Sequence, residues 1–363
     1  MGDTHKRVML VISSLGGGGA EGVCVNLANR LMERGWQVTL VVLHLNNAVR
    51  QKDLSPDVRL VVLGRNHART AIVALWRLLR QYKSDRILVF NHQIAVLLVL
   101  LRALGGFDFK IVARNISTLS QKKALETSFW HKYVVQALTK IFYGKVDHVI
   151  AQSKGMADDL VAFYGVQKEK IVTVHNPVDS SIEDYSESNQ KNMKDYLLCA
   201  GRLESVKAFH YAINAFAAVA PCYPSLRLKI VGKGRLEGEL KMQAEALGVG
   251  DRVDLEGYQT RMIPYYLGAK ATLLTSLYEG FPNVLVESIA LGTPVVSFDC
   301  PSGPSEIVVD GVNGFLVAHK DENQLADAIR KAMEADWNRD LVRVTAEQFS
   351  SDIILKQYEK VLG

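Results

Sequence analysis

Short apolar runs alternate with helix-length segments of helical periodicity through both halves of the 363-residue chain. This alternation predicts parallel β-strands joined by crossover helices, which is the α/β class of fold. The clearest helices are predicted at Ala20–Arg34, Arg69–Tyr82 and Lys154–Phe163. The runs predicted as strands are Val8–Ser14, Gln37–Leu43, Leu60–Leu63, Ile87–Asn91, Lys110–Arg114, His148–Gln152, Ile171–Val174, Tyr196–Ala200, Leu226–Val231, Val253–Glu256, Ala271–Thr275 and Pro294–Phe298.

A polar and poorly periodic stretch from Asp179 to Lys194 divides this pattern and has the composition of a loop or linker. The chain is long for one hydrophobic core and long enough for two. We predict two doubly wound, Rossmann-like domains at residues 1–180 and 181–338, with residues 339–363 as a C-terminal helix that packs back toward the first domain. Ligands of such sheets bind at the carboxyl ends of the strands, so a cleft is expected between two facing domains.

The segment SLYEGFPNVLVESIALGTPVV, residues 276–296, follows a predicted strand and predicts a helix that begins close to Pro282. The first N–H groups of a helix lack intrahelical partners and favour a phosphate. Glu279 lies in the loop before this helix, and Glu287 lies about one turn inside it. Carboxylates accept hydrogen bonds from hydroxyls, so the segment suits a sugar nucleotide. Two solvated helix-cap glutamates are the alternative.

With seven residues between its two glutamates, this segment resembles the donor-binding signature of the retaining glycosyltransferases of family 4. The resemblance implies the α/β GT-B fold of two Rossmann-like domains, a nucleotide-sugar donor as substrate, and no cofactor or metal. Other motifs resemble the family in the family's order: SLGGGGAE at Ser14–Glu21, HNPVD at His175–Asp179, Gly201-Arg202-Leu203 followed by Lys207, and Val231–Gly234.

The resemblance also implies how the second domain binds the donor. Arg202 and Lys207 would stabilise the negative charge that grows on the leaving diphosphate; two solvated cations are the alternative. Glu279 would contact the donor sugar's hydroxyls, and it is predicted to be catalytic together with Arg202 and Lys207. Glu287 would contact the ribose hydroxyls. The other residues implied at the donor are Gly201, Gly232, Gly234, Gly280, Phe281, Asn283, Val284 and Leu285, together with Pro282, which has no N–H to offer.

In the first domain, the loop of Gly16, Gly17, Gly18 and Gly19 precedes a predicted helix. Glycine backbone can approach a ligand closely, so the loop is predicted to bind phosphate or acceptor; a merely flexible loop is the alternative.

Many family members carry a histidine where this chain has Arg114-Asn115. We predict that either Arg114 and Asn115 or His92 contacts the substrates on the acceptor side. Glu21, in the glycine-loop motif, is also predicted on the acceptor side. A strand-end histidine bonded to a loop is the alternative for His92.

The sequence contains neither an Asp-x-Asp motif nor histidines at metal-ligand spacing, so no metal is expected. Cys24, Cys199, Cys222 and Cys300 are scattered and are interpreted as reduced packing residues of a cytosolic protein. The apolar run at Ile94–Leu101 is far shorter than the roughly 20 residues that a membrane span needs.

Charge differs between the halves: residues 1–175 hold 24 Lys and Arg against 12 Asp and Glu, whereas residues 176–363 hold 19 against 26. The first half is therefore predicted to face an anionic membrane surface; a solvated basic face is the alternative. Nucleic acid is not expected, because aromatic residues are not interleaved with the basic ones. The basic residues in question are Arg65, Arg69, Arg77, Arg80, Lys83 and Arg86, and Lys122, Lys123, Lys132 and Lys140.

The expected function is transfer of a hexose or N-acetylhexosamine, with UDP-sugars favoured as donors, to a polyprenyl-diphosphate-linked or other glycan acceptor in bacterial surface polysaccharide synthesis. The expected location is cytoplasmic, at the inner face of the membrane. A sugar-nucleotide epimerase and a non-catalytic binding subunit of the same fold are the alternatives. The base, sugar, linkage and oligomeric state stay open.

Overall fold

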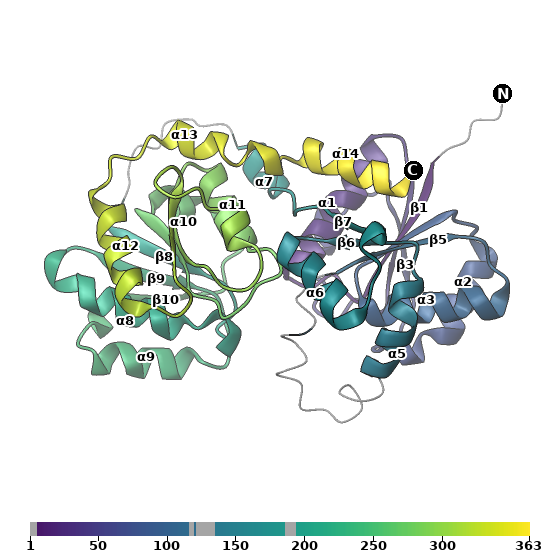
Figure 1. The fold of residues 1–363 in the computed structure, drawn as a ribbon, viewed down its shortest axis with the longest axis horizontal. Coiled ribbons are helices and arrows are strands. Elements are labelled where there is room, and N and C mark those ends of the chain that lie inside the picture. Colours follow the sequence, from purple (N-terminus) through teal and green to yellow (C-terminus); the bar gives the residue numbers. More distant parts are fainter. Residues whose placement is uncertain (1–5, 116–119, 121–134, 186–193) are drawn as a thin grey trace. The chain divides into compact units, whose positions relative to one another are not determined.

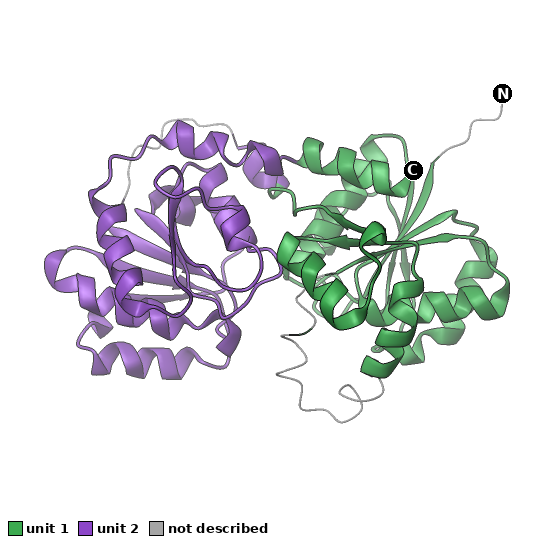
Figure 2. Cartoon of the chain, viewed as in Figure 1, with its two compact units in different colours: residues 1–179, 351–363 green, residues 180–350 purple. Residues whose placement is uncertain are grey.

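Two separate parallel β-sheets organise the protein, each with helices on its faces (Figure 1). The structure, a computed structural model, describes residues 6–115, 120, 135–185 and 194–363. The chain divides into unit 1, residues 1–179 and 351–363, and unit 2, residues 180–350 (Figure 2).

The sheet of unit 1 has seven strands in the order β3-β2-β1-β4-β5-β6-β7, all pairing in parallel. Alternate residues of the central strand β1 face opposite cores: Leu10 packs with α1 and α14, and Val11 packs with α2 and α3. The elements are β1 (Arg7–Ile12), α1 (Gly19–Glu33), β2 (Gln37–Val42), β3 (Arg59–Val62), α2 (Ile72–Gln81), β4 (Arg86–Val89), α3 (His92–Gly105), β5 (Lys110–Arg114), α5 (Gln136–Phe142), β6 (His148–Ala151), α6 (Lys154–Tyr164), β7 (Ile171–Thr173) and α14 (Ser351–Leu362).

The sheet of unit 2 has six strands in the order β10-β9-β8-β11-β12-β13, also parallel. Its core lies where Leu228 and Ile230 of β9 meet α8, α9 and α12. The elements are α7 (Ser180–Glu183), β8 (Tyr196–Ala200), α8 (Phe209–Val219), β9 (Arg227–Val231), α9 (Glu237–Ala246), β10 (Val253–Gly257), α10 (Ile263–Gly268), β11 (Ala271–Leu274), α11 (Asn283–Ala290), β12 (Val295–Phe298), β13 (Gly314–Val317), α12 (Glu322–Glu334) and α13 (Arg339–Val344).

The last residues of the chain differ from the single C-terminal helix predicted for 339–363. Two helices form there: α13 belongs to unit 2 and α14 belongs to unit 1. Polar contacts hold α14 to unit 1, because Arg34 pairs with Asp352 at 2.7 Å and the Trp36 indole N–H donates to Glu359 at 3.0 Å.

The predicted strands all form, but β13 was not predicted, and the apolar run at Ile94–Leu101 lies within helix α3. Within the described residues, no helix is both long enough and apolar enough to cross a membrane.

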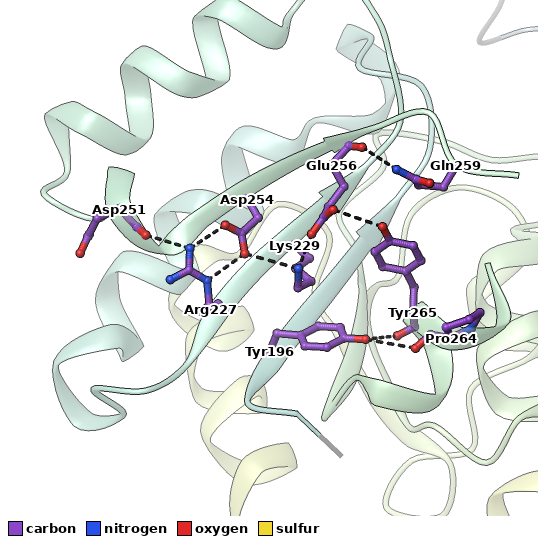
Figure 3. A network of polar contacts seen from close by, with 9 residues as sticks. All are labelled: Tyr196, Arg227, Lys229, Asp251, Asp254, Glu256, Gln259, Pro264 and Tyr265. Carbon is purple, nitrogen blue, oxygen red and sulfur yellow. Dashed lines mark hydrogen bonds and ion pairs between the residues drawn. The ribbon is translucent and has the colours of Figure 1, made fainter. Parts of the chain in front are cut away.

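The edge of the second sheet carries a cross-strand network of charges (Figure 3). Arg227 of β9 makes two hydrogen bonds to Asp254 of β10, at 2.8 and 2.6 Å, and these lower the pKa of that carboxyl. Lys229 pairs with Glu256, which also accepts a hydrogen bond from the Tyr265 hydroxyl at 3.1 Å. The network therefore ties helix α10 to the face of the sheet.

Candidate functional site

Lys207 and Glu279 form an ion pair in unit 2, with 2.6 Å between Nζ and Oε1. Lys207 follows β8 and Glu279 follows β11, and these two strands are neighbours in the sheet. The pair thus lies at the carboxyl ends of parallel strands, where ligands of such sheets bind. The side chains are only 17% and 13% exposed, so solvent screens the pair less than it would a surface pair.

Three further hydrogen bonds fix the geometry of this ion pair. The N–H of Leu277 donates to the Val206 carbonyl at 2.8 Å, and the Thr275 hydroxyl donates to the Lys207 carbonyl at 3.1 Å. The Ser276 hydroxyl donates to Glu279 Oε1 at 2.6 Å. Ser276 was missed from the sequence, although its place three residues before Glu279 was a usable signal.

Arg202 and Cys300 complete the surroundings of the ion pair. Arg202 is exposed and lies close enough to Tyr278 to lower the pKa of its hydroxyl, against the larger upward effects of burial and Glu279. Burial raises the pKa of the Cys300 thiol; Glu279 raises it further and Lys207 lowers it. Cys300 is therefore a protonated neighbour of the pair.

Three of the glycines predicted at the donor, Gly201, Gly232 and Gly234, lie in the loops after β8 and β9. A Cβ on Gly232 would lie 1.8 Å from the Gly201 carbonyl oxygen, and one on Gly234 would lie 2.3 Å from the Leu203 carbonyl oxygen. The loops after β8 and β9 are thus in direct backbone contact. The contact accounts for the absence of a Cβ at Gly232 and Gly234.

Ala208, which immediately precedes α8, has a φ of +46°. That left-handed conformation is unfavourable by about 1–2 kcal/mol for a residue with a Cβ. The strain lies next to Lys207, where the surrounding hydrogen bonds hold the backbone.

Helix α11 begins at Asn283, as the sequence predicts, with Pro282 at the cap position. The loop after β12 supports the preceding turn: the Glu279 N–H donates to the Pro301 carbonyl at 3.0 Å and the Ser302 hydroxyl donates to the Gly280 carbonyl at 3.1 Å. A Cβ on Gly303, whose φ is +104°, would lie 2.6 Å from Pro282 Cδ. This supporting loop was not recognised as part of the site.

Two of the residues predicted to contact the donor around α11 serve packing or the helix itself. The Leu285 N–H donates to the Pro282 carbonyl at 3.0 Å, so it is not available to a ligand as predicted. The Phe281 side chain is buried against Phe349, with 5.5 Å between ring centroids. Asn283 and Val284 lie in the first turn and are half-buried.

Glu287 is half-buried on α11 and accepts a hydrogen bond from the Tyr266 hydroxyl at 2.6 Å. Tyr266 belongs to α10 and is 1% exposed. No pattern in the sequence indicated this partner, because the two residues belong to different helices.

In unit 1 the carboxylate of Glu21 lies next to the glycine loop, residues 16–19. A Cβ on Gly18 would lie 2.4 Å from Glu21 Oε2, and one on Gly16 would lie 3.9 Å from Glu21 Oε1. A carboxylate in this position repels phosphate and accepts hydrogen bonds from hydroxyls. Of the two predicted roles of Gly16–Gly19, the geometry favours the acceptor.

Arg114 and Asn115 are 1% and 2% exposed, and Nη1 of Arg114 and Nδ2 of Asn115 are buried without a hydrogen-bond partner among the described residues. Arg114 Nε donates to the Tyr358 hydroxyl at 2.7 Å and Nη2 donates to Asn176 Oδ1 at 2.5 Å. Arg114 therefore joins β5 to α14. His92, the other predicted residue, is half-buried at the first position of α3.

Three of the lysines predicted to face a membrane surface, Lys122, Lys123 and Lys132, lie outside the described residues. Within the described part of the chain, no three His, Cys, Asp or Glu side chains gather as a metal site would require.

Two family models match the chain in succession: Glycosyltransferase Family 4 at residues 17–182 and Glycosyl transferases group 1 at residues 181–348. The chain belongs to the family 4 glycosyltransferases. In this family 4 glycosyltransferase, the first match falls largely in unit 1 and the second in unit 2.

Known proteins similar to this family 4 glycosyltransferase include relatives of nearly the same length. It is 25% identical over 341 residues, 91% of each chain, to the N-acetylgalactosamine-N,N'-diacetylbacillosaminyl-diphospho-undecaprenol 4-alpha-N-acetylgalactosaminyltransferase of Campylobacter jejuni. It is 22% identical over 369 residues to the amylovoran biosynthesis glycosyltransferase AmsD of Erwinia amylovora, covering 99% of this chain and 100% of the other.

Solved structures show the GT-B fold for this family 4 glycosyltransferase. The apo lipopolysaccharide outer core galactosyltransferase WaaB matches with a TM-score of 0.75 and 20% identity over 98% of each chain. HepE of Anabaena, in complex with UDP-glucose, matches with a TM-score of 0.81 and 20% identity over 99% of each chain. The predicted fold is thereby confirmed.

Proposed function

We propose that the protein is a retaining, metal-independent hexosyltransferase whose unit 2 binds a nucleotide-diphosphate sugar and whose unit 1 binds the acceptor. The observation that carries this is the Lys207–Glu279 ion pair at the carboxyl ends of β8 and β11, with Arg202 exposed nearby. Because Lys207 compensates the charge of Glu279, the carboxylate can contact sugar hydroxyls without repelling the adjacent diphosphate.

The proposed reaction uses these groups as follows. The acceptor hydroxyl oxygen forms a bond to C1 of the sugar on the face from which the diphosphate departs. The C1–O bond breaks with its electron pair going to the diphosphate, and the hydroxyl proton passes to a departing phosphate oxygen. Arg202 and Lys207 are preorganised cations for the charge that grows on the leaving group.

The names of similar proteins support the finer choice of substrates. A solved relative binds UDP-glucose, and the Campylobacter relative is named for transfer of N-acetylgalactosamine to a glycan on diphospho-undecaprenol. We propose a UDP-hexose or UDP-N-acetylhexosamine donor and a polyprenyl-diphosphate-linked glycan acceptor in bacterial surface glycan synthesis, at the cytoplasmic face of the membrane.

A thermal-shift panel of nucleotide sugars tests the donor. A bound donor at 100 times its dissociation constant should stabilise the protein by about 2.7 kcal/mol. Stabilisation by no nucleotide sugar would overturn the proposal. Donor consumption without acceptor would favour the epimerase, and unchanged output of the whole pathway with a Glu279→Ala variant would favour the binding subunit. An NMR time course in which the inverted anomer forms first would refute retention.

The α2 region of unit 1 carries the proposed membrane contact. Residues 58–84 contain six Lys and Arg and no Asp or Glu. Arg65, Arg69 and Arg77 are exposed, and the first turn of α2 exposes Ile72 by 44% and Val73 by 60%. Exposed apolar side chains beside cations, with no acidic residue in the segment, complement an anionic lipid surface.

Replacing Arg69 and Arg77 together with alanine is expected to weaken binding to vesicles that contain phosphatidylglycerol by roughly thirtyfold, since each lost cation contributes about 1 kcal/mol near such a surface. Sedimentation of protein with vesicles at low salt measures this. The matched control replaces Lys241 and Lys331, exposed residues of unit 2, and should leave binding unchanged. Equal effects of the two double variants would contradict a role for α2.

A further inference from the structure

Two consecutive tyrosines of α10 each donate a hydrogen bond to a glutamate. Tyr265 donates to Glu256 at 3.1 Å, within the charge network at the edge of the sheet (Figure 3). Tyr266 donates to Glu287 at 2.6 Å, and Glu287 lies on α11, directly behind the turn that contains Glu279. The two hydroxyls thus make the same kind of hydrogen bond, but the glutamates that accept these bonds lie in different parts of unit 2.

The surroundings of Tyr266 hold its hydroxyl in one position. Its side chain is 1% exposed, and its carbonyl accepts a hydrogen bond from the Thr293 hydroxyl at 2.7 Å. The Thr293 carbonyl in turn accepts from the Ser288 hydroxyl at 3.0 Å, which links α10 to α11 through buried groups. A phenol ring has few rotamers, so a tyrosine packed in this way is a fixed donor.

Glu287, in contrast, has a long and flexible side chain and is half-buried. A carboxylate offers about four lone-pair sites, so a bond from Tyr266 at Oε2 leaves it able to accept from other hydroxyls. Loss of that bond would remove one of the constraints on the carboxylate, and ordering it for a ligand would then weaken binding.

We propose that Tyr266 is a positioning residue that holds the Glu287 carboxylate ready for the ribose hydroxyls of the donor nucleotide. It thereby makes unit 2 selective for ribonucleotides over nucleotides that lack those hydroxyls. This inference rests on the proposed function, because it assumes that a nucleoside diphosphate binds next to α11.

The test compares uridine, guanosine and adenosine diphosphates with their 2′,3′-dideoxy counterparts by calorimetric titration. In the wild-type protein the ribose form of the preferred base should bind more tightly than its dideoxy form. Tyr266→Phe should weaken binding of the ribose form by about tenfold, the scale of a hydrogen bond to a charged group, and leave dideoxy binding unchanged. Tyr265→Phe is the matched control and should change neither.

Glu287→Gln provides a second measurement. If Tyr266 acts through Glu287, adding Tyr266→Phe to Glu287→Gln should weaken ribonucleotide binding by far less than it does in the wild type. Thermal melts check that each variant is folded.

Each other outcome overturns a defined part of the argument. A loss of affinity that is equal for ribose and dideoxy forms would show that Tyr266 only stabilises the fold. A wild-type protein that binds both forms equally would remove the role of Glu287 and with it that of Tyr266. If no nucleoside diphosphate binds the wild type, the proposed function fails and this inference fails with it.

Discussion

Replacing Lys207 with methionine is expected to reduce kcat/KM for sugar transfer by about 10²–10³-fold, the effect of removing one preorganised group that stabilises transition-state charge. Two losses combine in this variant. The leaving diphosphate loses a cation, and Glu279, which is 13% exposed, loses the ion-pair partner that lies 2.6 Å away. The charge of Glu279, no longer offset by Lys207, then repels an adjacent diphosphate.

The matched control is Lys270→Met. Lys270 also pairs with a carboxylate in unit 2, Asp195 at 3.5 Å, but it lies directly before β11, at the amino ends of the strands and opposite the carboxyl ends where Lys207 lies. Its replacement should leave kcat/KM within about twofold of the wild-type value. Exposed ion pairs contribute only roughly 0–1 kcal/mol to stability, and this pair lies away from the proposed reaction site. A Lys207→Met enzyme that is as active as the Lys270→Met enzyme would remove Lys207 from the mechanism.

Replacing Gly232 with alanine is expected to lower the free energy of unfolding of unit 2 by more than about 3 kcal/mol, beyond the usual range for overpacking. The added Cβ would lie 1.8 Å from the Gly201 carbonyl oxygen, and neither group can escape by changing a rotamer. The loops after β8 and β9 must separate, and the segment that leads to Lys207 moves with them.

Gly238→Ala is the control for that variant. Gly238 lies in α9, and a Cβ added there would have no neighbouring atom within 4 Å, so alanine should stabilise the protein by about 0.5–1 kcal/mol through helix propensity. Urea denaturation followed by far-UV circular dichroism should therefore move the midpoint in opposite directions for the two variants. An unchanged midpoint for Gly232→Ala would show that the loops accommodate a side chain.

The fold was largely predictable because the strands that carry it are short, apolar and regularly spaced. The strand β13, Gly314–Val317, was missed because it has only four residues, begins with glycine and follows a turn-rich segment. Helix α3 was not assigned because Ile94, Ala95, Val96, Leu97, Leu98 and Val99 are all buried, and a helix that is apolar all round shows no helical periodicity.

The site was predictable only in part, because its contacts join residues that are distant in sequence. The glutamates and cations were identified from their positions in sequence motifs. The hydrogen bonds from Lys207 to Glu279 and from Tyr266 to Glu287, however, depend on contacts between segments that are distant in sequence. The hydrogen-bond partners of Arg114 were not predictable for a related reason. A polar residue at the end of a strand gives no sign of whether it meets solvent or, as here, a buried tyrosine of the C-terminal helix.

The return of α14 to unit 1 also determines the order in which the chain can complete its folding during synthesis. Residues 180–350 are contiguous, so unit 2 has its whole sequence before residue 351 has been translated. Unit 1 begins first but needs the last residues, since Arg114 and Trp36 bond to Tyr358 and Glu359. Unit 1 is therefore expected to complete its fold only after residues 351–363 have been translated, although its synthesis begins first.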